Sequence, residues 1–416
     1  MKLRINITSL TQYLMLYFML NTMSTGYLLT LGNNWPLIGL AASVFVLVWH
    51  GRGNHQSILI VVASTIVCII LTRYLVGGIG IFAIYVIVSR ILLGYTSVIV
   101  DKKNCALRLI RLGSVLNVGS LIYYTIFSFN KSLLPVLLPF EGVAESGAVF
   151  LFNPVFTYNA QGINDTVLRN NGIYTEPTLM AIQLLSLIFL LIFLNKKICM
   201  TETERKKHLI IAVITLLTTL STTGIIAFSI AIIIYVLMGD KSVAFKIRVV
   251  ILIGIFFLIA TVEWTLNGQN GIVYEFFLRK TTSINEAGQM VVDLSADTGI
   301  ARISAIVAAL SLIFKYPLGC GYTIYNDHVS KYSLMGVQSA GGGIVNEIAI
   351  FGIIPVSVAL VYILKGVSKY IDKSAIPIFI VIFFSTTMAE STMYYSIFFT
   401  IATIGYVNYN AKDVDI

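Results

Sequence analysis

The stretch RNNGIYTEPTLMAIQLLSLIFLLIF, residues 169–193, joins a polar turn to a long apolar run. After Pro177 the run holds no charged residue before the stretch ends at Phe193. An α-helix rises about 1.5 Å per residue, so a run of this length nearly spans the roughly 30 Å hydrocarbon core of a bilayer. The stretch therefore predicts a membrane helix that begins directly after a charged turn.

The composition of the whole chain points to the same class of protein. Hydrophobic residues make up 57% of the 416 residues, charged residues only 11%, and the mean hydropathy is +0.88. A soluble domain of this size does not reach such values. Apolar runs recur from end to end and are unbroken rather than alternating, which favours helices over a β-barrel. We expect an all-α polytopic membrane protein that forms a single integral membrane domain over residues 1–416.

The positions of the lysines and arginines predict how the chain crosses the membrane. Most of the 28 cationic residues fall in short connections that alternate along the chain, and such connections face the cytoplasm. This pattern places both termini in the cytoplasm and explains the net charge of +9 without a nucleic-acid partner. The predicted transmembrane helices, about twelve in number, are 10–31, 35–50, 57–75, 77–100, 113–130, 178–194, 209–222, 225–238, 247–266, 344–364, 374–390 and 392–407.

Two of the predicted outward-facing segments are long, 131–177 and 267–343. Connections of that length are usually functional or disordered, and the apolar residues in these two favour ordered structure. The second contains ISAIVAALSLIF, residues 303–314. If that stretch crossed the membrane, the basic connection after the next helix would face outward. We therefore expect an external or re-entrant helix there, and we expect the chemistry in these two large extracytoplasmic loops.

Arg169, Gly172, Glu176 and Pro177 bring several chemical groups to the start of one apolar run. Pro177 suits the first turn of the helix, where its missing N–H would have had no partner. Glu176 then lies at the positive end of the helix dipole, which keeps a carboxylate ionised and able to accept a proton or hold an arginine. Gly172 permits a tight turn that folds Arg169 back over the helix end. The alternative is an ordinary interfacial ion pair between Arg169 and Glu176.

Arg302 is a second cationic residue in a predicted outer loop. It stands at the head of ARISAIVAALSLIFKYPLGCGY, residues 301–322, whose proline and glycines predict a sharp exit from the helix. Two arginines from separate loops would suit a diphosphate, because guanidinium groups bind phosphate oxygens bidentately and stay charged. The alternative is an arginine that extends along the membrane surface to keep its charge in water.

Three further features have both a functional and a structural interpretation. Arg90 lies inside an apolar run, where a charge is either functional or satisfied by extending to the interface or by pairing. The turn TTLSTTG, residues 218–224, offers hydroxyl groups that would contact a sugar or cap the adjoining helices. The glycine-rich SAGGGIVNE, residues 339–347, allows close approach of the backbone to a ligand or to a neighbouring helix.

Four segments occur in the same order as the motifs of one enzyme superfamily. RNNGIYTEPTLMA resembles the Arg-x-x-Gly-aromatic-x-Glu-Pro signature of the O-antigen polymerase and ligase superfamily. LTTLSTTGIIAF, residues 217–228, is similar to its Leu-Ser-x-Thr-Gly turn, and residues 301–322 resemble its arginine-led helix that ends in Pro-x-Gly-x-Gly. NEIAIFGIIP, residues 346–355, resembles its Gly-Ile entry to a late helix. By motif the resemblance covers about residues 165–360, and elsewhere it concerns topology alone.

The resemblance implies a C-class glycosyltransferase fold and a metal-independent glycosyltransferase without a cofactor. Its donor would be an undecaprenyl-diphosphate-linked oligosaccharide at the outer face of the bacterial inner (plasma) membrane. By that analogy Arg169 and Arg302 hold the donor diphosphate, while Glu176 positions Arg169 or acts as base. The residues expected to bind substrate are Gly172, Tyr174, Pro177, Ser221, Arg279, Tyr322 and His328.

Two departures from the superfamily pattern bear on the reaction. Many relatives have an arginine after the serine of the turn, where this chain has Thr222. Ligases usually carry a His-Asn pair before the late helix, where this chain reads SAGGGIVNE. The missing histidine favours a polymerase, unless His328 folds into its place.

We expect an O-antigen or capsular polysaccharide polymerase, which would serve the biosynthesis of lipopolysaccharide or capsule. A chain-length regulator could be its partner in the membrane. The alternatives are an O-antigen ligase and a flippase or transporter of lipid-linked oligosaccharide. Transporters concentrate charged residues at the membrane midplane, whereas the charged candidates of this chain lie mainly in the outer loops, which disfavours transport.

Overall fold

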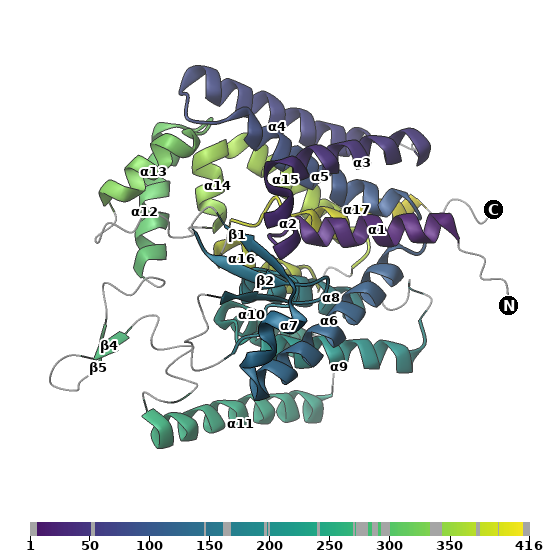
Figure 1. The fold of residues 1–416 in the computed structure, drawn as a ribbon, viewed down its shortest axis with the longest axis vertical. Coiled ribbons are helices and arrows are strands. Elements are labelled where there is room, and N and C mark those ends of the chain that lie inside the picture. Colours follow the sequence, from purple (N-terminus) through teal and green to yellow (C-terminus); the bar gives the residue numbers. More distant parts are fainter. Residues whose placement is uncertain are drawn as a thin grey trace.

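The structure of the protein, a computed structural model, is a helical membrane protein with a small amount of sheet (Figure 1). It describes residues 6–50, 55–144, 147–160, 168–194, 198, 200–238, 242–268, 271, 282–284, 290–292, 300–332, 343–371, 375–389 and 391–410.

The first part of the chain forms the longer membrane helices. The elements are α1 (Ile7–Asn21), α2 (Gly26–Leu31), η1 (Gly32–Asn34), α3 (Trp35–His50), α4 (Gln56–Leu75), α5 (Ile81–Ile99) and α6 (Cys105–Phe129). Among the described residues, four helical segments are long and apolar enough to cross a membrane: α4, α5, α6 and the joined residues Gly26–His50. The single helix predicted over 10–31 is wrong in detail, because the chain breaks between α1 and α2, where Ser24 has a φ of 69°.

The second part of the chain contains ten more helices between described residues, most of them shorter than α4, α5 and α6. They are α8 (Pro177–Phe193), α9 (Glu202–Thr218), α10 (Thr222–Met238), α11 (Val243–Asn267), α12 (Ile300–Lys315), α13 (Gly321–Tyr332), α14 (Gly343–Phe351), α15 (Ile353–Ser368), α16 (Ile376–Ala389) and α17 (Ser396–Asn410). The helix predicted over 344–364 is two helices, because Gly352, with a φ of 96°, separates α14 from α15. Several of the others are apolar but shorter than a full span, so the total of about twelve crossings stays a prediction.

The segment between α6 and α8 contains strands that the sequence did not predict. It holds η2 (Lys131–Leu133), α7 (Leu134–Leu137) and a sheet of β1 (Phe140–Val143), β2 (Val149–Phe152) and β3 (Thr157–Asn159). Both strand pairs are antiparallel, in the order β1-β2-β3. The described part of the second long segment adds the hairpin of β4 (Thr282–Ile284) and β5 (Met290–Val292). The structure is mainly helical, as an all-α membrane protein should be, and the described strands lie in the two long loops.

Helices that are distant in sequence lie side by side in the membrane layer (Figure 1). Helix α17 packs against both α5 and α15, and α10 packs against α16. Glycines make the closest of these contacts: a Cβ on Gly405 would lie 1.9 Å from the carbonyl oxygen of Gly366, and one on Gly94 would lie 2.4 Å from that of Ser396. The start of α1 and the end of α17 lie on the same side of the molecule (Figure 1).

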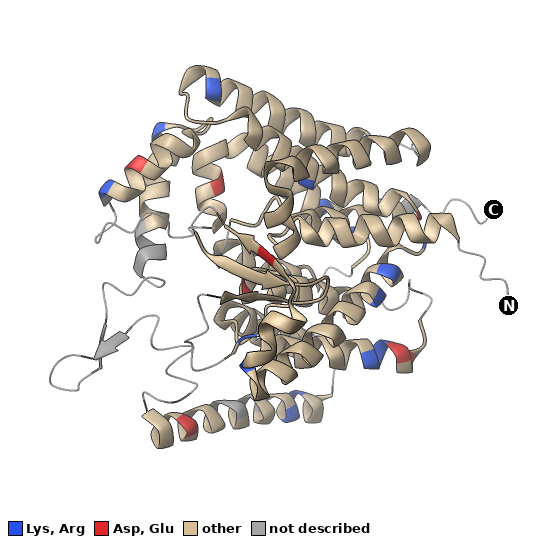
Figure 2. Ribbon diagram, in the orientation of Figure 1, with Lys and Arg blue, Asp and Glu red and all other residues tan. Residues whose placement is uncertain are grey.

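The outer faces of the helices are apolar. Large hydrophobic side chains with more than half of their surface exposed include Val48, Trp49, Tyr74, Leu252 and Leu258. Figure 2 shows that charged residues are sparse on these helices. Apolar surface of this extent suits contact with lipid rather than water.

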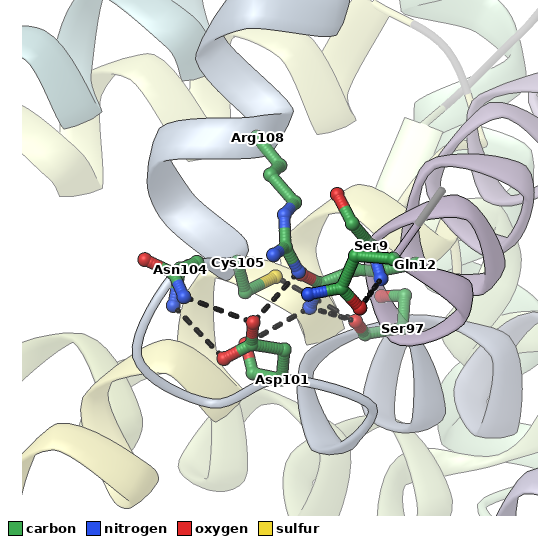
Figure 3. A network of polar contacts seen from close by, with 8 residues as sticks. Ser9, Gln12, Ser97, Asp101, Asn104, Cys105 and Arg108 are labelled. Atoms are coloured by element: carbon green, nitrogen blue, oxygen red, sulfur yellow. Dashed lines mark hydrogen bonds and ion pairs between the residues drawn. The ribbon is translucent and has the colours of Figure 1, made fainter. Parts of the chain in front are cut away.

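Connections that charge bias assigns to the cytoplasm contact one another. Arg108 pairs with Asp101 at 2.8 Å and also donates to Gln12 Oε1, and the Gln12 amide donates to the Ser97 carbonyl at 2.9 Å (Figure 3). This network joins the start of α6 to α1 and to the end of α5. Arg111 similarly pairs with Glu204 of α9 at 2.8 Å.

Connections assigned to the outside also contact one another. The Thr323 amide of α13 donates to the Gly78 carbonyl at 3.3 Å, and the Thr72 hydroxyl donates to the Leu318 carbonyl at 2.5 Å. The Thr175 amide donates to Ser24 at 3.1 Å. The contacts near the predicted inner ends and those near the predicted outer ends are thus made by different residues, and the orientation of the chain stays a prediction.

Candidate functional site

Arg169 connects two of the segments that the sequence singled out. Its Nη2 donates to the carbonyl oxygen of Leu220 at 3.0 Å, so the loop before α8 is tied to the turn between α9 and α10. Leu220 has a φ of 49°, a left-handed conformation that is strained for a branched side chain. This conformation belongs to the same turn that Arg169 contacts, and Arg169 itself is partly buried.

Asn170 stabilises the same loop through buried hydrogen bonds. Its amide nitrogen donates to Thr218 Oγ1 at 2.9 Å, and its side-chain oxygen accepts from the Gly172 N–H at 3.0 Å. Its backbone N–H donates to the Thr218 carbonyl at 3.0 Å. Asn170 is completely buried, so these bonds satisfy polar groups that have no access to water. The loop is therefore a fixed structure rather than a loose connection.

Gly172 and Tyr174 complete the turn. Gly172 has a φ of 55°, and a Cβ at this position would lie 2.5 Å from Met180 Sδ, so both conformation and space require glycine. Tyr174 is fully buried and its hydroxyl donates to Gln183 Oε1 at 2.6 Å. In this structure Tyr174 has no exposed surface for a substrate, and it instead fixes the loop against α8.

Glu176 and Pro177 begin α8 as the sequence predicted. Pro177 is the first residue of the helix, and Glu176 is its N-cap residue in an extended conformation. Glu176 is exposed, and its side chain makes no capping hydrogen bond. Among the ion pairs between described residues, none joins Arg169 to Glu176. The alternative of a simple ion pair between these two residues is therefore not what the structure contains.

Ser221 has a structural position. Its Oγ accepts from the Gly224 N–H at 3.3 Å at the start of α10, and only 1% of the residue is exposed. The serine therefore caps the helix, which is the structural alternative that the sequence left open.

The other two motifs also contact each other. The Cys320 amide donates to the Ala349 carbonyl at 2.8 Å, and the Ile353 amide donates to the Pro317 carbonyl at 3.0 Å. Gly319 and Gly352 allow this approach, since a Cβ on Gly352 would lie 2.5 Å from the backbone of Leu318. The turn after α12 is thus packed against the junction of α14 and α15.

Tyr322 and His328 lie on α13, beside this second contact. Tyr322 is 43% exposed, and its ring meets Phe351 edge to face at 5.7 Å between centroids. Partial burial is the main cause that raises the pKa of Tyr322 to about 12. The negative charge of Glu347 adds to this shift, and the positive charge of Arg90 opposes it. The His328 imidazole meets Ser311 Oγ at 2.8 Å.

The pKa of His328 lies below its usual value. Partial burial is the main cause, and the positive charges of Lys315 and Lys331 add to it. Neutral imidazole therefore dominates at neutral pH, so His328 would contact a ligand by hydrogen bonding rather than by charge.

Two predicted site residues cannot be placed in the same detail. Arg302 belongs to α12, but its side chain lies outside the described residues, and so does the whole of Arg279. The described parts of the chain therefore locate Arg169 and the helix that carries Arg302, but not the distance between their guanidinium groups.

Arg90, a charged residue outside the predicted site, is surrounded by side chains from distant parts of the chain. Its guanidinium carbon lies 4.7 Å from the centroid of the Tyr395 ring and 5.6 Å from that of Trp35. Its Nε is buried without a hydrogen-bond partner. Glu347 of α14 is 4% exposed and accepts from the Met393 N–H at 3.3 Å. We call Arg90, Trp35, Glu347 and Tyr395 the Arg90 cluster.

The free-energy cost of placing the Arg90 charge in an apolar helix is only partly offset by its contacts with aromatic rings. A charged side chain at the centre of a membrane helix costs about 2.5–3.5 kcal/mol. A cation–π contact returns about 0.5–2 kcal/mol, depending on how far the contact is desolvated. In the sequence, the charge of Arg90 inside an apolar run was the signal that pointed to this cluster. The partners of Arg90 come from α3, α14 and the residue before α17, and no sequence spacing connects them.

We predict that Gly172→Ala destabilises the loop before α8. The added methyl group meets Met180 and the positive φ disfavours alanine, so thermal unfolding of the purified protein should shift to lower temperature, by about 1–3 kcal/mol in stability. The double variant Gly172→Ala/Met180→Ala removes the clash but keeps the conformational cost. If Gly172→Ala unfolds at the same temperature as the parent protein, the fixed geometry of this loop is wrong.

No protein-family model matches the chain, and no curated protein matches it. What the chain does is therefore inferred from its own residues and from their geometry.

Proposed function

We propose that the protein is a polysaccharide polymerase that joins undecaprenyl-diphosphate-linked oligosaccharide units at the outer face of the bacterial inner membrane, with both termini in the cytoplasm. Such an enzyme would make O-antigen or capsular polysaccharide. Its membrane character rests on the apolar helices and their exposed apolar faces. The reaction is proposed from the motifs and from the way in which they contact one another.

The contact between Arg169 and Leu220 carries the proposal. It joins the Arg-x-x-Gly-aromatic-x-Glu-Pro segment to the turn segment that follows in the motif order, although 51 residues separate the two. The later two motifs form their own contact through Cys320 and Ala349. Helix α16 packs against α10 of the first pair and against α14 of the second. Motifs that resemble one superfamily thus gather around common helices, which supports a shared functional region.

In the proposed reaction a hydroxyl group of the acceptor sugar attacks C1 of the donor sugar. The bond between C1 and the diphosphate oxygen breaks, the new glycosidic bond forms with inversion, and the lipid diphosphate leaves with the bonding electron pair. Arg169 and Arg302 would stabilise the negative charge that develops on the leaving group. Glu176 is exposed at the positive end of α8, where it would accept the proton of the attacking hydroxyl.

We predict that Arg169→Ala shortens the polysaccharide to single units. Loss of one group that stabilises the leaving group lowers a rate by about 10²–10³, measured as chain extension of purified lipid-linked units. Arg169→Lys separates two roles, since lysine can still donate to the Leu220 carbonyl but cannot form the two-pronged contact with a phosphate. We expect the lysine variant to fold normally and to stay nearly inactive.

Arg73→Gln is the matched control for Arg169. Arg73 also belongs to a predicted outer end and donates to one backbone carbonyl, that of Ile79, at 3.1 Å. The control should make polymer of normal length. Long polymer from a well-expressed Arg169→Ala protein would contradict the proposed role of Arg169. Polymer left on the carrier lipid in a deletion strain would instead identify a ligase.

We predict that Glu176→Gln lowers the rate of chain extension without lowering stability. The side chain is exposed and makes no capping hydrogen bond, so the amide removes the base while leaving every described contact in place. Single-turnover extension and thermal unfolding of the same preparation measure the two effects. Unchanged extension at neutral pH would show that another group accepts the proton.

A further inference from the structure

The Arg90 cluster contains no residue of the loop that carries Arg169. Arg90 is in the middle of α5, and its guanidinium lies beside two rings at helix starts: Trp35 opens α3, and Tyr395 directly precedes α17. Helical side chains point toward the helix N-terminus. The N-terminal end of α5 follows the 76–80 connection, which contacts α13. The charge is therefore carried toward the predicted outer surface.

The protein leaves the charge of Arg90 incompletely paired. Its Nε is enclosed without a hydrogen-bond partner, and none of the ion pairs between described residues includes Arg90. The residue as a whole is only partly buried. A charge in apolar surroundings is normally paired or functional. The rings of Trp35 and Tyr395 fix the position of the guanidinium but supply no negative charge.

We propose that Arg90 binds a phosphate group carried by a lipid. Phosphate oxygens match the planar guanidinium fork, and the neighbouring aromatic rings do not neutralise its charge. A lipid presents its phosphate at the depth where an arginine extending from the middle of a membrane helix can reach it. The lipid is either an isoprenoid carrier, as the proposed function would require, or a phospholipid of the bilayer.

Glu347 sets the strength of this site. Met393, which donates to Glu347, lies two residues before Tyr395, whose ring lies beside the Arg90 guanidinium, so Glu347 and Arg90 lie in one neighbourhood. Its carboxylate is held by the Met393 N–H at 3.3 Å. When this buried carboxyl is ionised, its negative charge opposes a bound phosphate and balances the charge of Arg90. Removal of the charge should therefore tighten phosphate binding.

Trp35 provides a direct readout, because its ring lies beside the guanidinium. The chain has three tryptophans, so Trp49→Phe and Trp264→Phe leave Trp35 as the single tryptophan, which is excited selectively at the red edge of its absorption. The full-length protein in a nonionic detergent is titrated with farnesyl diphosphate, with dihexanoyl phosphatidylglycerol and with farnesol. The first two probes share the lipid phosphate, and farnesol lacks it.

We expect a saturable change in Trp35 emission with at least one phosphate probe and none with farnesol. Arg90→Gln should weaken that binding about tenfold or more, Arg90→Lys should weaken it several-fold, and Glu347→Gln should tighten it several-fold. Arg73→Gln, an exposed arginine at the same predicted end, should leave it unchanged. Tighter binding of farnesyl diphosphate identifies a carrier lipid, and tighter binding of phosphatidylglycerol identifies a bilayer lipid.

Equal affinity in the parent protein and in a folded Arg90→Gln or Arg90→Lys variant would overturn the proposal. An equal response to farnesol, or weaker binding in Glu347→Gln, would do the same, since the ligand would then not be recognised by its phosphate. The experiment does not depend on polymer formation. Binding at Arg90 can therefore fail while polymerisation stands, and polymerisation can fail while binding at Arg90 stands.

Discussion

The hydrogen bond from Arg169 to the carbonyl of Leu220 is the interaction on which the proposed site depends. It fixes a cationic residue at the meeting point of the loop before α8 and the turn before α10. Asn170 and Gly172 give that loop one conformation through buried hydrogen bonds and a left-handed turn. Buried polar groups in an apolar protein are costly unless satisfied, so the loop and the turn specify each other. Arg169 is thereby held in place before any substrate binds, which reduces the reorganisation that charge stabilisation requires.

The protein handles its charged residues in different ways at its two predicted surfaces. On the predicted inner side, Arg108 and Arg111 meet the carboxylates of Asp101 and Glu204, and these pairs join neighbouring helices. On the predicted outer side, Arg169 meets a backbone carbonyl, and Arg90 meets aromatic rings. A carbonyl oxygen and two aromatic rings are thus among the partners of the outer arginines, whereas the inner arginines meet carboxylates.

The apolar runs predicted most helices because burial in lipid demands satisfied backbone groups, and Pro177 marked the start of α8 correctly. The break between α1 and α2 was missed because its polar groups are satisfied by distant residues: Thr22 meets Ser396, and the Thr175 amide bonds to Ser24. The division at Gly352 has the same cause, namely contact with Leu318. The three-stranded sheet was missed because its strands are only three or four residues long, too short for a clear alternation.

The candidate site was predicted unevenly for a related reason. The positions of Glu176 and Pro177 follow from local helix chemistry, and the structure places both as expected. Whether a tyrosine or serine faces a ligand depends on packing, and Tyr174 and Ser221 prove to be buried. The grouping of Arg90 with Trp35, Glu347 and Tyr395 joins four distant parts of the chain. A single sequence contains no signal for such a contact beyond the unusual charge itself.

The central claim is that Arg169 and Arg302 converge on one lipid-borne diphosphate. An experimental structure of the protein with a bound isoprenoid diphosphate measures this directly, through the distances from both guanidinium groups to the phosphate oxygens. The account predicts that both lie at charge-assisted hydrogen-bond distance, roughly 2.7–2.9 Å. A diphosphate bound by only one of them, or two arginines facing different cavities, would contradict it.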